Sequence, residues 1–242
     1  MSGILESNWW GVVRVLNSDG LRMFLFWLVL AIAAGEIAVA WIALGPVGAM
    51  KTEGVGAEQA SATALFAALV IYTIDRFGAG NVRSWHVAFL LAMLALRELD
   101  LDKRLFADGM LKLRFYTGNE APLWQKGIGG AVVVTILVAV WRLFRQQFRE
   151  WRAALLAKAV WAWVVLAAFV VGALAKSLDG IGRKLAPFGI RFDSDLDLAF
   201  GLIEETLEMF FALALVLAVC IAPRARRDQT SEVTLSHHRK RE

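Results

Sequence analysis

The chain has 242 residues, of which 58% are hydrophobic, and its mean hydropathy is +0.57. This composition excludes an ordinary soluble domain, in which about 45–50% of residues are apolar. The net charge of +4 is spread over connections and a tail, which argues against a nucleic-acid-binding surface, and the single cysteine, Cys220, excludes an internal disulfide or a cysteine-based metal site.

The apolar residues form blocks of about 20, the length that crosses a ~30 Å hydrocarbon core. Apolar side chains recur at helical spacing in residues 1–20, which predicts an N-terminal interfacial amphipathic helix. Residues 21–222 are expected to form an all-α membrane domain of six transmembrane helices, at 22–45, 59–77, 81–99, 126–146, 153–176 and 196–221. Residues 223–242 are expected to form a basic, disordered cytoplasmic tail.

The third predicted span is short, because only 13 uncharged residues separate Arg83 from Arg97. Its flanking arginines would have to snorkel towards the head groups for it to cross. Keeping this span places both termini on one side of the membrane, together with the connections 77–81 and 146–153. Without it, the tail would lie opposite the basic segment 142–152.

Basic residues favour this arrangement, since 15 of the 26 fall on the side of the termini. They are Arg14, Arg22, Arg76, Arg83, Arg142, Arg145, Arg149, Arg152, Lys158, Arg224, Arg226, Arg227, Arg239, Lys240 and Arg241. By the positive-inside rule both termini are cytoplasmic, and we expect a multi-pass protein of a bacterial plasma (inner) membrane.

Two connections on the outer side are long. Residues 97–125 are amphipathic, and we expect a short interfacial helix near 103–114. Residues 177–195 contain glycines and a proline and are expected to be irregular.

Three glutamates interrupt the apolar character of the last span. On a helix, Glu204 and Glu208 share a stripe with Asp197, whereas Glu205 points away by about a further quarter turn. Glu36 in the first span falls at the same depth as Glu204 when each helix is measured from its own end at about 1.5 Å per residue.

The end of the third span adds Glu98 and Asp102, which share a helix face at i, i+4. The candidate ion- or proton-binding residues are therefore Glu36, Glu98, Asp102, Glu204 and Glu208. Carboxylates within a span cost ~2.5–3.5 kcal/mol each on insertion scales, so they must hold protons, pair with cations or coordinate a metal. An oxygen-rich set such as Glu36, Glu204 and Glu208 would suit a hard divalent cation. A purely structural network of buried ion pairs is the alternative.

The aspartates before the last span have a simpler explanation. Asp193, Asp195 and Asp197 occupy alternate positions of a calcium-loop pattern, but Leu198 stands where that loop needs glycine. Ser194 and Asp197 instead match a capping box, which predicts a helix start.

Other chemistries lack their residues in this sequence. His86 is the only histidine inside a predicted span, so a bis-histidine haem is not expected. The sequence has no phosphate-binding glycine–lysine motif and no dinucleotide fingerprint, so no nucleotide is expected either.

Three functions follow from these residues. The leading one is a carboxylate-rich site in the outer half of the bundle that binds or conducts a cation, or couples protons to transport of a small solute. The second is a membrane enzyme acting on a lipid or lipid-linked phosphate, whose anionic head group would be bound by Arg97, Lys112, Arg114, Arg183 and Lys184. The third is a non-catalytic subunit or scaffold of a membrane complex. The expected partners are the lipid bilayer and further copies or subunits, with no nucleic acid.

Overall fold

The computed structural model describes residues 19–78, 82–106, 109–118 and 121–223, and every regular element within these ranges is a helix. The all-α prediction is therefore confirmed for this part of the chain. The predicted amphipathic segment 1–20 and the predicted tail 223–242 lie almost entirely outside the described residues.

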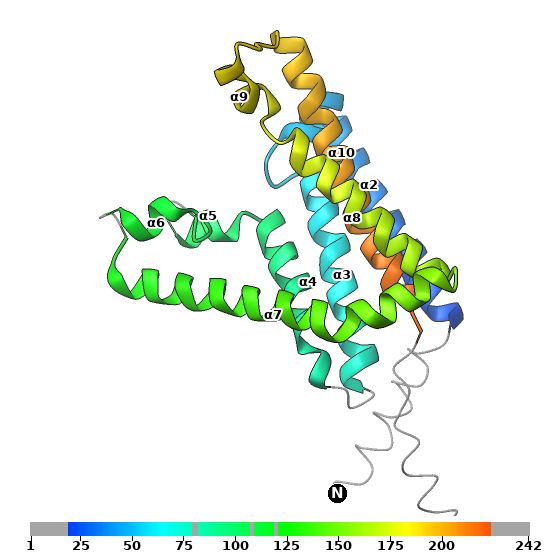
Figure 1. Ribbon diagram of the computed structural model, residues 1–242. Coiled ribbons are helices and arrows are strands. Elements are labelled where there is room, and N and C mark those ends of the chain that lie inside the picture. Colours follow the sequence, from blue (N-terminus) through cyan, green and yellow to red (C-terminus); the bar gives the residue numbers. More distant parts are fainter. Residues whose placement is uncertain (1–18, 79–81, 107–108, 119–120, 224–242) are drawn as a thin grey trace, which may run out of the picture.

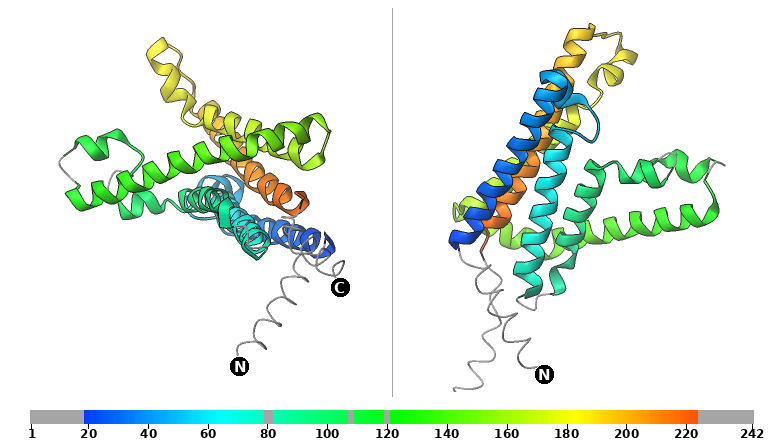
Figure 2. Two further views of the ribbon diagram at one scale, coloured as in Figure 1. Left: turned by 60° about the horizontal axis from the view of Figure 1, so that its bottom comes forward. Right: turned by 180° about the vertical axis from the view of Figure 1, so that it is seen from behind.

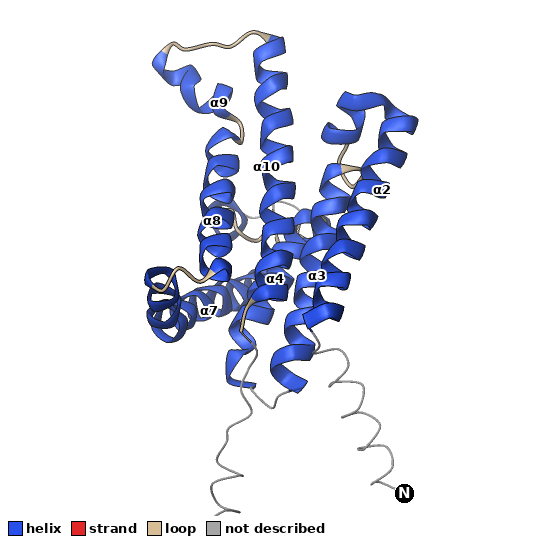
Figure 3. Ribbon diagram, turned by 90° about the vertical axis from the view of Figure 1, so that its right-hand side faces the viewer, coloured by secondary structure: helices blue, strands red, loops and turns tan. Residues whose placement is uncertain are grey.

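Five helices form an elongated bundle: α2 (Asp19–Lys51), α3 (Ala57–Gly78), α4 (Trp85–Glu98), α8 (Val160–Leu178) and α10 (Ser194–Ile221) (Figure 1). A 3₁₀ turn, η1 (Val82–Ser84), leads into α4. The α10 helix packs against α8, α3 and α2, while α3 also packs against α4 (Figure 3). At one end α2 begins and α3 and α10 end, and we call this the basic end. The opposite end, where α10 begins, is called the carboxylate end.

Small side chains bring these helices close together. The buried core contains Ala64 and Ala68 of α3, Ala95 of α4 and Ala212 of α10. Between α8 and α10, the Phe211 ring lies 3.0 Å from the point that a Cβ atom on Gly172 would occupy. Alanine and glycine at such contacts allow close backbone approach, which is the packing mode of helices in lipid.

The long helix α7 (Leu123–Leu156) crosses this bundle instead of running along it (Figure 2). Its predicted end at 146, followed by a connection at 146–153, is wrong, because the helix continues to Leu156. Residues 142–156 contain no glycine or proline and are rich in arginine, leucine, glutamine and alanine, which are good helix formers.

The first half of α7 projects sideways together with α5 (Leu101–Leu105) and α6 (Leu113–Thr117) (Figure 1). Two short helices thus replace the single helix predicted near 103–114, with Gly109 interrupting them. The Phe115 ring packs edge-on against Phe106 at 5.4 Å between ring centroids, and the Lys126 ammonium donates a hydrogen bond to the Gly118 carbonyl oxygen at 2.6 Å. These contacts hold the lateral arm together.

The connection 177–195 also contains short helices, α9 (Ile181–Leu185) and the 3₁₀ helix η2 (Ala186–Phe188), between irregular segments. A capping side chain fixes the start of α10: the Asp193 carboxylate accepts a hydrogen bond from the Leu196 backbone N–H at 2.8 Å. The cap is therefore Asp193 and not the predicted Ser194, because an aspartate one residue earlier reaches the same orphan amides.

Four described helices are long and apolar enough to cross a membrane: Asp19–Lys51, Ala57–Phe77, Leu123–Leu156 and Val160–Leu178. The predicted third span is a 14-residue helix, α4, because η1 takes up its first residues. The α10 helix has 28 residues, but each 18-residue stretch of it contains Glu204, Glu205 and Glu208. The chain is compatible with a multi-pass membrane protein, while the predicted number of six spans is not confirmed.

The α2 helix bends near its end. Gly45 has φ 74° and ψ 174°, a conformation that favours glycine, and Pro46 then starts the last turns of the helix. Because of this bend, the last turns of α2, which end at Lys51, run in a different direction from the rest of the helix.

A buried ion pair joins three helices at the basic end. The Arg22 guanidinium lies 3.1 Å from the Asp75 carboxylate, and only 3% and 5% of these side chains are exposed. Arg22 also donates a hydrogen bond to the Ala222 carbonyl oxygen at 3.1 Å, just past the end of α10. Arg22 of α2 thus connects Asp75 of α3 with the negative end of the α10 dipole.

Replacing Asp75 with asparagine should destabilise the protein by about 3–5 kcal/mol, because Arg22 would remain buried without its counter-charge. Thermal unfolding in detergent measures this effect. Arg76→Gln is the matched control, since Arg76 is 24% exposed and pairs more loosely with Asp75, at 3.5 Å. Equal losses of stability in the two variants would contradict the prediction that Arg22, buried without its counter-charge, destabilises the protein.

Candidate functional site

Ionisable residues from five helices meet at the carboxylate end. There the first turn of α3 and the middle of α10, at residues 204–208, lie near the ends of α4, α8 and α2, in the upper half of the bundle in Figure 3. The best-defined contact joins α4 to α10: the Arg97 guanidinium donates a hydrogen bond to the Glu208 carboxylate at 2.9 Å. This pair joins the end of the third predicted span to the middle of the sixth.

Further carboxylates surround this pair. Glu98 lies within electrostatic range of Glu208, Glu205 and Glu58. Glu205 in turn lies close to Glu204. We call Glu58, Glu98, Glu204, Glu205 and Glu208 the carboxylate cluster; all five are partly buried.

Lysine 51 supplies a positive charge from the bent end of α2. Its charge acts on both Glu204 and Glu205. A Cβ atom on Gly201 would lie 2.0 Å from the Lys51 Nζ atom. The ammonium therefore occupies space on the surface of α10 that only a glycine leaves open.

Glu204 lies near the end of α8. There its neighbours are Asp179 and Lys176, which form an ion pair with each other. The hydrogen bond from Lys176 holds the pKa of Asp179 below its usual value. Glu204 and Glu208 thus lie within electrostatic range of each other, as the predicted stripe requires, while Glu204 also meets α8 and Glu208 meets α4. Glu205 lies within the cluster as well.

Glu36 lies against α3 beside the carboxylate cluster. Its Oε1 atom accepts hydrogen bonds from Thr63 at 2.9 Å and from Gln59 at 3.2 Å, both on α3. Its Oε2 atom is buried without a hydrogen-bond partner among the described residues. Glu36 therefore connects α2 to α3 beside the cluster, and the side chain of Asp102 lies outside the described part of the chain.

Three members of the site were not among the predicted ion- or proton-binding residues: Glu205, which was interpreted as pointing away from the stripe, Glu58 and Lys51. Glu58 stands just before the second predicted span, and Lys51 follows the Gly45–Pro46 bend. Both residues lie just outside the outer end of a predicted span. When helices pack side by side, the charged residues next to their ends come close together, so this position in the sequence could have identified both.

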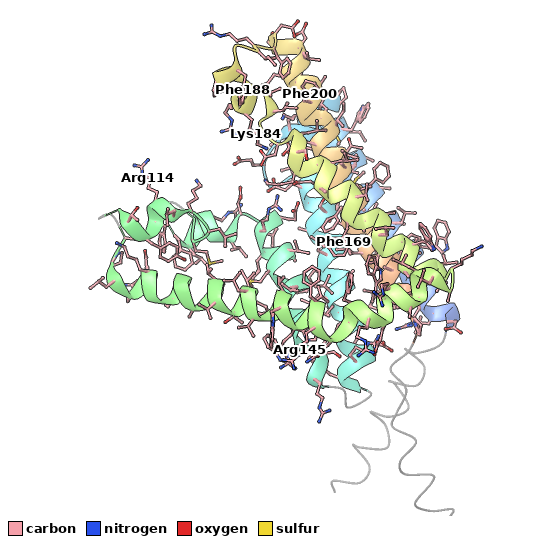
Figure 4. The ribbon with its side chains drawn as sticks, viewed as in Figure 1. Arg114, Arg145, Phe169, Lys184, Phe188 and Phe200 are labelled. Carbon is pink, nitrogen blue, oxygen red and sulfur yellow. The ribbon has the colours of Figure 1, made fainter. Side chains whose placement is uncertain are left out.

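The basic residues predicted to bind an anionic head group are not gathered in one place. Arg97 is paired with Glu208, and Lys184 donates a hydrogen bond to the Lys176 carbonyl oxygen at 3.1 Å. Arg114 and the exposed Lys112 belong to the lateral arm, far from Lys184 (Figure 4). Arg183 packs against the backbone at Gly180.

An apolar groove of about 670 Å³ runs along α2 and α3, with Arg22 at one end and Gln59 at the other. Its wall consists mainly of α3 side chains such as Phe66 and Val70. Gln59 and Leu99 line it and directly follow Glu58 and Glu98 in the chain, so the groove reaches the edge of the carboxylate cluster.

The predicted set of metal ligands, Glu36, Glu204 and Glu208, does not come together as one group. Each faces a different partner: Thr63 and Gln59, the end of α8, and Arg97 respectively. Within the described residues no three histidine, cysteine, aspartate or glutamate side chains are arranged to hold a metal ion.

Comparisons with models of protein families, with curated proteins and with solved structures found no match to this chain.

Gly201→Ala tests the position of Lys51. In a helix, glycine to alanine normally stabilises by up to about 1 kcal/mol. Gly35→Ala in α2, where a Cβ atom would meet nothing within 4 Å, should show this gain in thermal unfolding. Gly201→Ala should not, because the new methyl group displaces the Lys51 ammonium from the carboxylates.

Labelling Lys51 with an amine-reactive reagent, followed by mass spectrometry, gives a second measurement. The labelling rate should rise in Gly201→Ala and stay unchanged in Gly35→Ala. Stabilisation of both variants with unchanged labelling would show that Lys51 does not occupy this position.

Proposed function

We propose that this protein is a membrane protein in which the carboxylate cluster binds a cation in exchange for protons, as a step in cation transport or in proton-coupled transport of a small solute. The observation that carries the proposal is an excess of negative groups where several helices meet. Five carboxylates, Glu58, Glu98, Glu204, Glu205 and Glu208, share this region with two basic side chains, Arg97 and Lys51.

The charges do not balance within the cluster. If all five carboxylates were ionised, Arg97 and Lys51 would leave a formal charge of −5 + 2 = −3. Lys176 is already paired with Asp179 and does not remove this excess. Like charges in a partly desolvated region disfavour one another, so the cluster must take up protons or external cations.

The exposure of the cluster suits exchange with water. Each of its five glutamates is partly buried, so water and ions can reach it while some of its own hydration is lost. A fully buried group would exchange slowly, and a fully exposed one would bind weakly because water screens it. Intermediate burial supports reversible binding.

The neighbouring groove supports a coupled solute. Its apolar wall meets the cluster at Gln59 and Leu99. A solute with an apolar body could lie along α3 while its polar end approaches Glu58 and Glu98. Protonation of the cluster would then change how well that polar end is bound, which is the basis of coupling.

The competing hypothesis is that these carboxylates only hold the helices together. The ion pair between Arg97 and Glu208 is the contact that would do so. Glu98 and Glu205 distinguish the two functions, because neither forms an ion pair in the described structure, whereas Glu208 does. Removing unpaired negative charges should stabilise a purely structural cluster, but it should abolish the response of a binding site.

The test compares the parent protein with the double variant Glu98→Gln/Glu205→Gln. The parent should be stabilised by one of Na⁺, K⁺ or Ca²⁺ in thermal unfolding, by about 2.7 kcal/mol when the cation is present at about 100 times its dissociation constant. The double variant should fold and lose this response. A pH-sensitive dye inside vesicles should report proton movement when the cation is added to the parent alone.

The matched control is Glu53→Gln/Asp195→Asn, which removes the same charge from two exposed residues near the same end. It should keep the full response to the cation. If no cation or pH change affects the parent, or if both double variants lose the response equally, the cluster is not a binding site.

A further inference from the structure

The second half of α7, residues 142–156, carries an exposed row of arginines. Arg145, Arg149 and Arg152 are all exposed and follow one another at spacings of four and three residues. They therefore lie on one face of the helix. Arg145 additionally stacks on Trp141, with its guanidinium carbon 5.0 Å from the ring centroid.

These three arginines have no acidic partner in the described structure. None of them takes part in an ion pair with a described carboxylate. The acidic residue of this segment, Glu150, lies about 100° or more away around the helix at 100° per residue. The row is thus an uncompensated positive surface.

Exposed aromatic side chains lie beside the row. Phe144 and Phe148 are 60% and 42% exposed, and their ring centroids lie 6.2 Å apart. Trp141 is 58% exposed. Large apolar rings next to arginines on one helix are typical of a helix in the membrane interface, with the rings among acyl chains and the charges among head groups.

Contacts on the other side of α7 hold this segment in place. The Trp151 indole N–H donates a hydrogen bond to the Ala162 carbonyl oxygen of α8 at 3.1 Å, and Gln147 lies 3.4 Å from the His86 ring nitrogen of α4. Arg142 precedes the row on nearly the same face, lies over the Trp85 ring of α4 and is not part of the row. Arg145, Arg149 and Arg152 remain exposed.

The row also lies at the appropriate end of the molecule. α7 crosses the bundle near its basic end, and Arg145 projects towards the side where α2 begins and α10 ends (Figure 4). Because residues 142–156 run across the other helices at this end, the whole row can face a membrane surface (Figure 4).

We infer that residues 142–156 form a binding site for acidic phospholipid head groups at the basic end of the protein. Arg145, Arg149 and Arg152 bind the phosphate oxygens, for which the planar guanidinium fork is well suited. Phe144 and Phe148 insert beside the acyl chains. The site is independent of the carboxylate cluster, which lies at the opposite end of the bundle.

Native mass spectrometry of the full-length protein tests this inference, with phosphatidylglycerol and phosphatidylcholine titrated separately. The parent should bind phosphatidylglycerol more tightly. In Arg145→Gln/Arg149→Gln, affinity for phosphatidylglycerol should fall roughly thirtyfold, since each basic residue near an acidic lipid surface contributes roughly fivefold.

The matched control is Arg104→Gln/Arg191→Gln, which removes two exposed charges outside the arginine row. It should bind phosphatidylglycerol within twofold of the parent. Arg145→Lys/Arg149→Lys keeps the charge and should retain most of the affinity, which separates loss of binding from loss of folding. Equal binding of the two lipids by the parent, or equal losses in the two glutamine variants, would overturn the inference.

Discussion

The buried pair of Arg22 and Asp75 is the contact on which the arrangement of the bundle depends. Separating these charges from water is costly, and the cost is offset only when each charge meets the other at close range. Arg22 further meets the carbonyl groups that end α10. One side chain therefore aligns α2 with α3 and α10 along the bundle.

The two ends of the bundle differ in how well their charges are matched. At the basic end, Asp75 is shared between Arg22 and Arg76, which also donate hydrogen bonds to the carbonyl oxygens of Ala222 and Pro223. At the carboxylate end, Glu98 and Glu205 form no ion pair among the described residues. A buried ion pair between helices at one end and unpaired carboxylates at the other is the arrangement expected when binding occurs at one end while the other preserves the fold.

The sequence predicted the all-helical class and the approximate limits of the main helices, because long apolar blocks can bury themselves in only a few ways in lipid. It did not predict that α7 crosses the bundle, since this depends on tertiary contacts such as Trp151 with Ala162. Analysis of one helix likewise grouped Glu204 with Glu208. Which glutamates meet depends on the helices that flank α10 on each side, and these were unknown. The predicted end of the first span at residue 45 was wrong, because Pro46 restarts the helix after Gly45 and α2 continues to Lys51.

The bend at Gly45 gives the proposed site a link between binding and movement. Lys51 reaches the carboxylates from a short terminal segment of α2, whereas the carboxylates themselves belong to α3, α4 and α10. Gly201 leaves the space that the ammonium enters. A cation bound among the carboxylates would compete with Lys51 for the same negative charge, and so would release the end of α2 from α10. The end of α2 would then have two positions, one with Lys51 among the carboxylates and one without. The cation would favour the second position to the extent that it binds that state more tightly, and binding would thereby cause a conformational change.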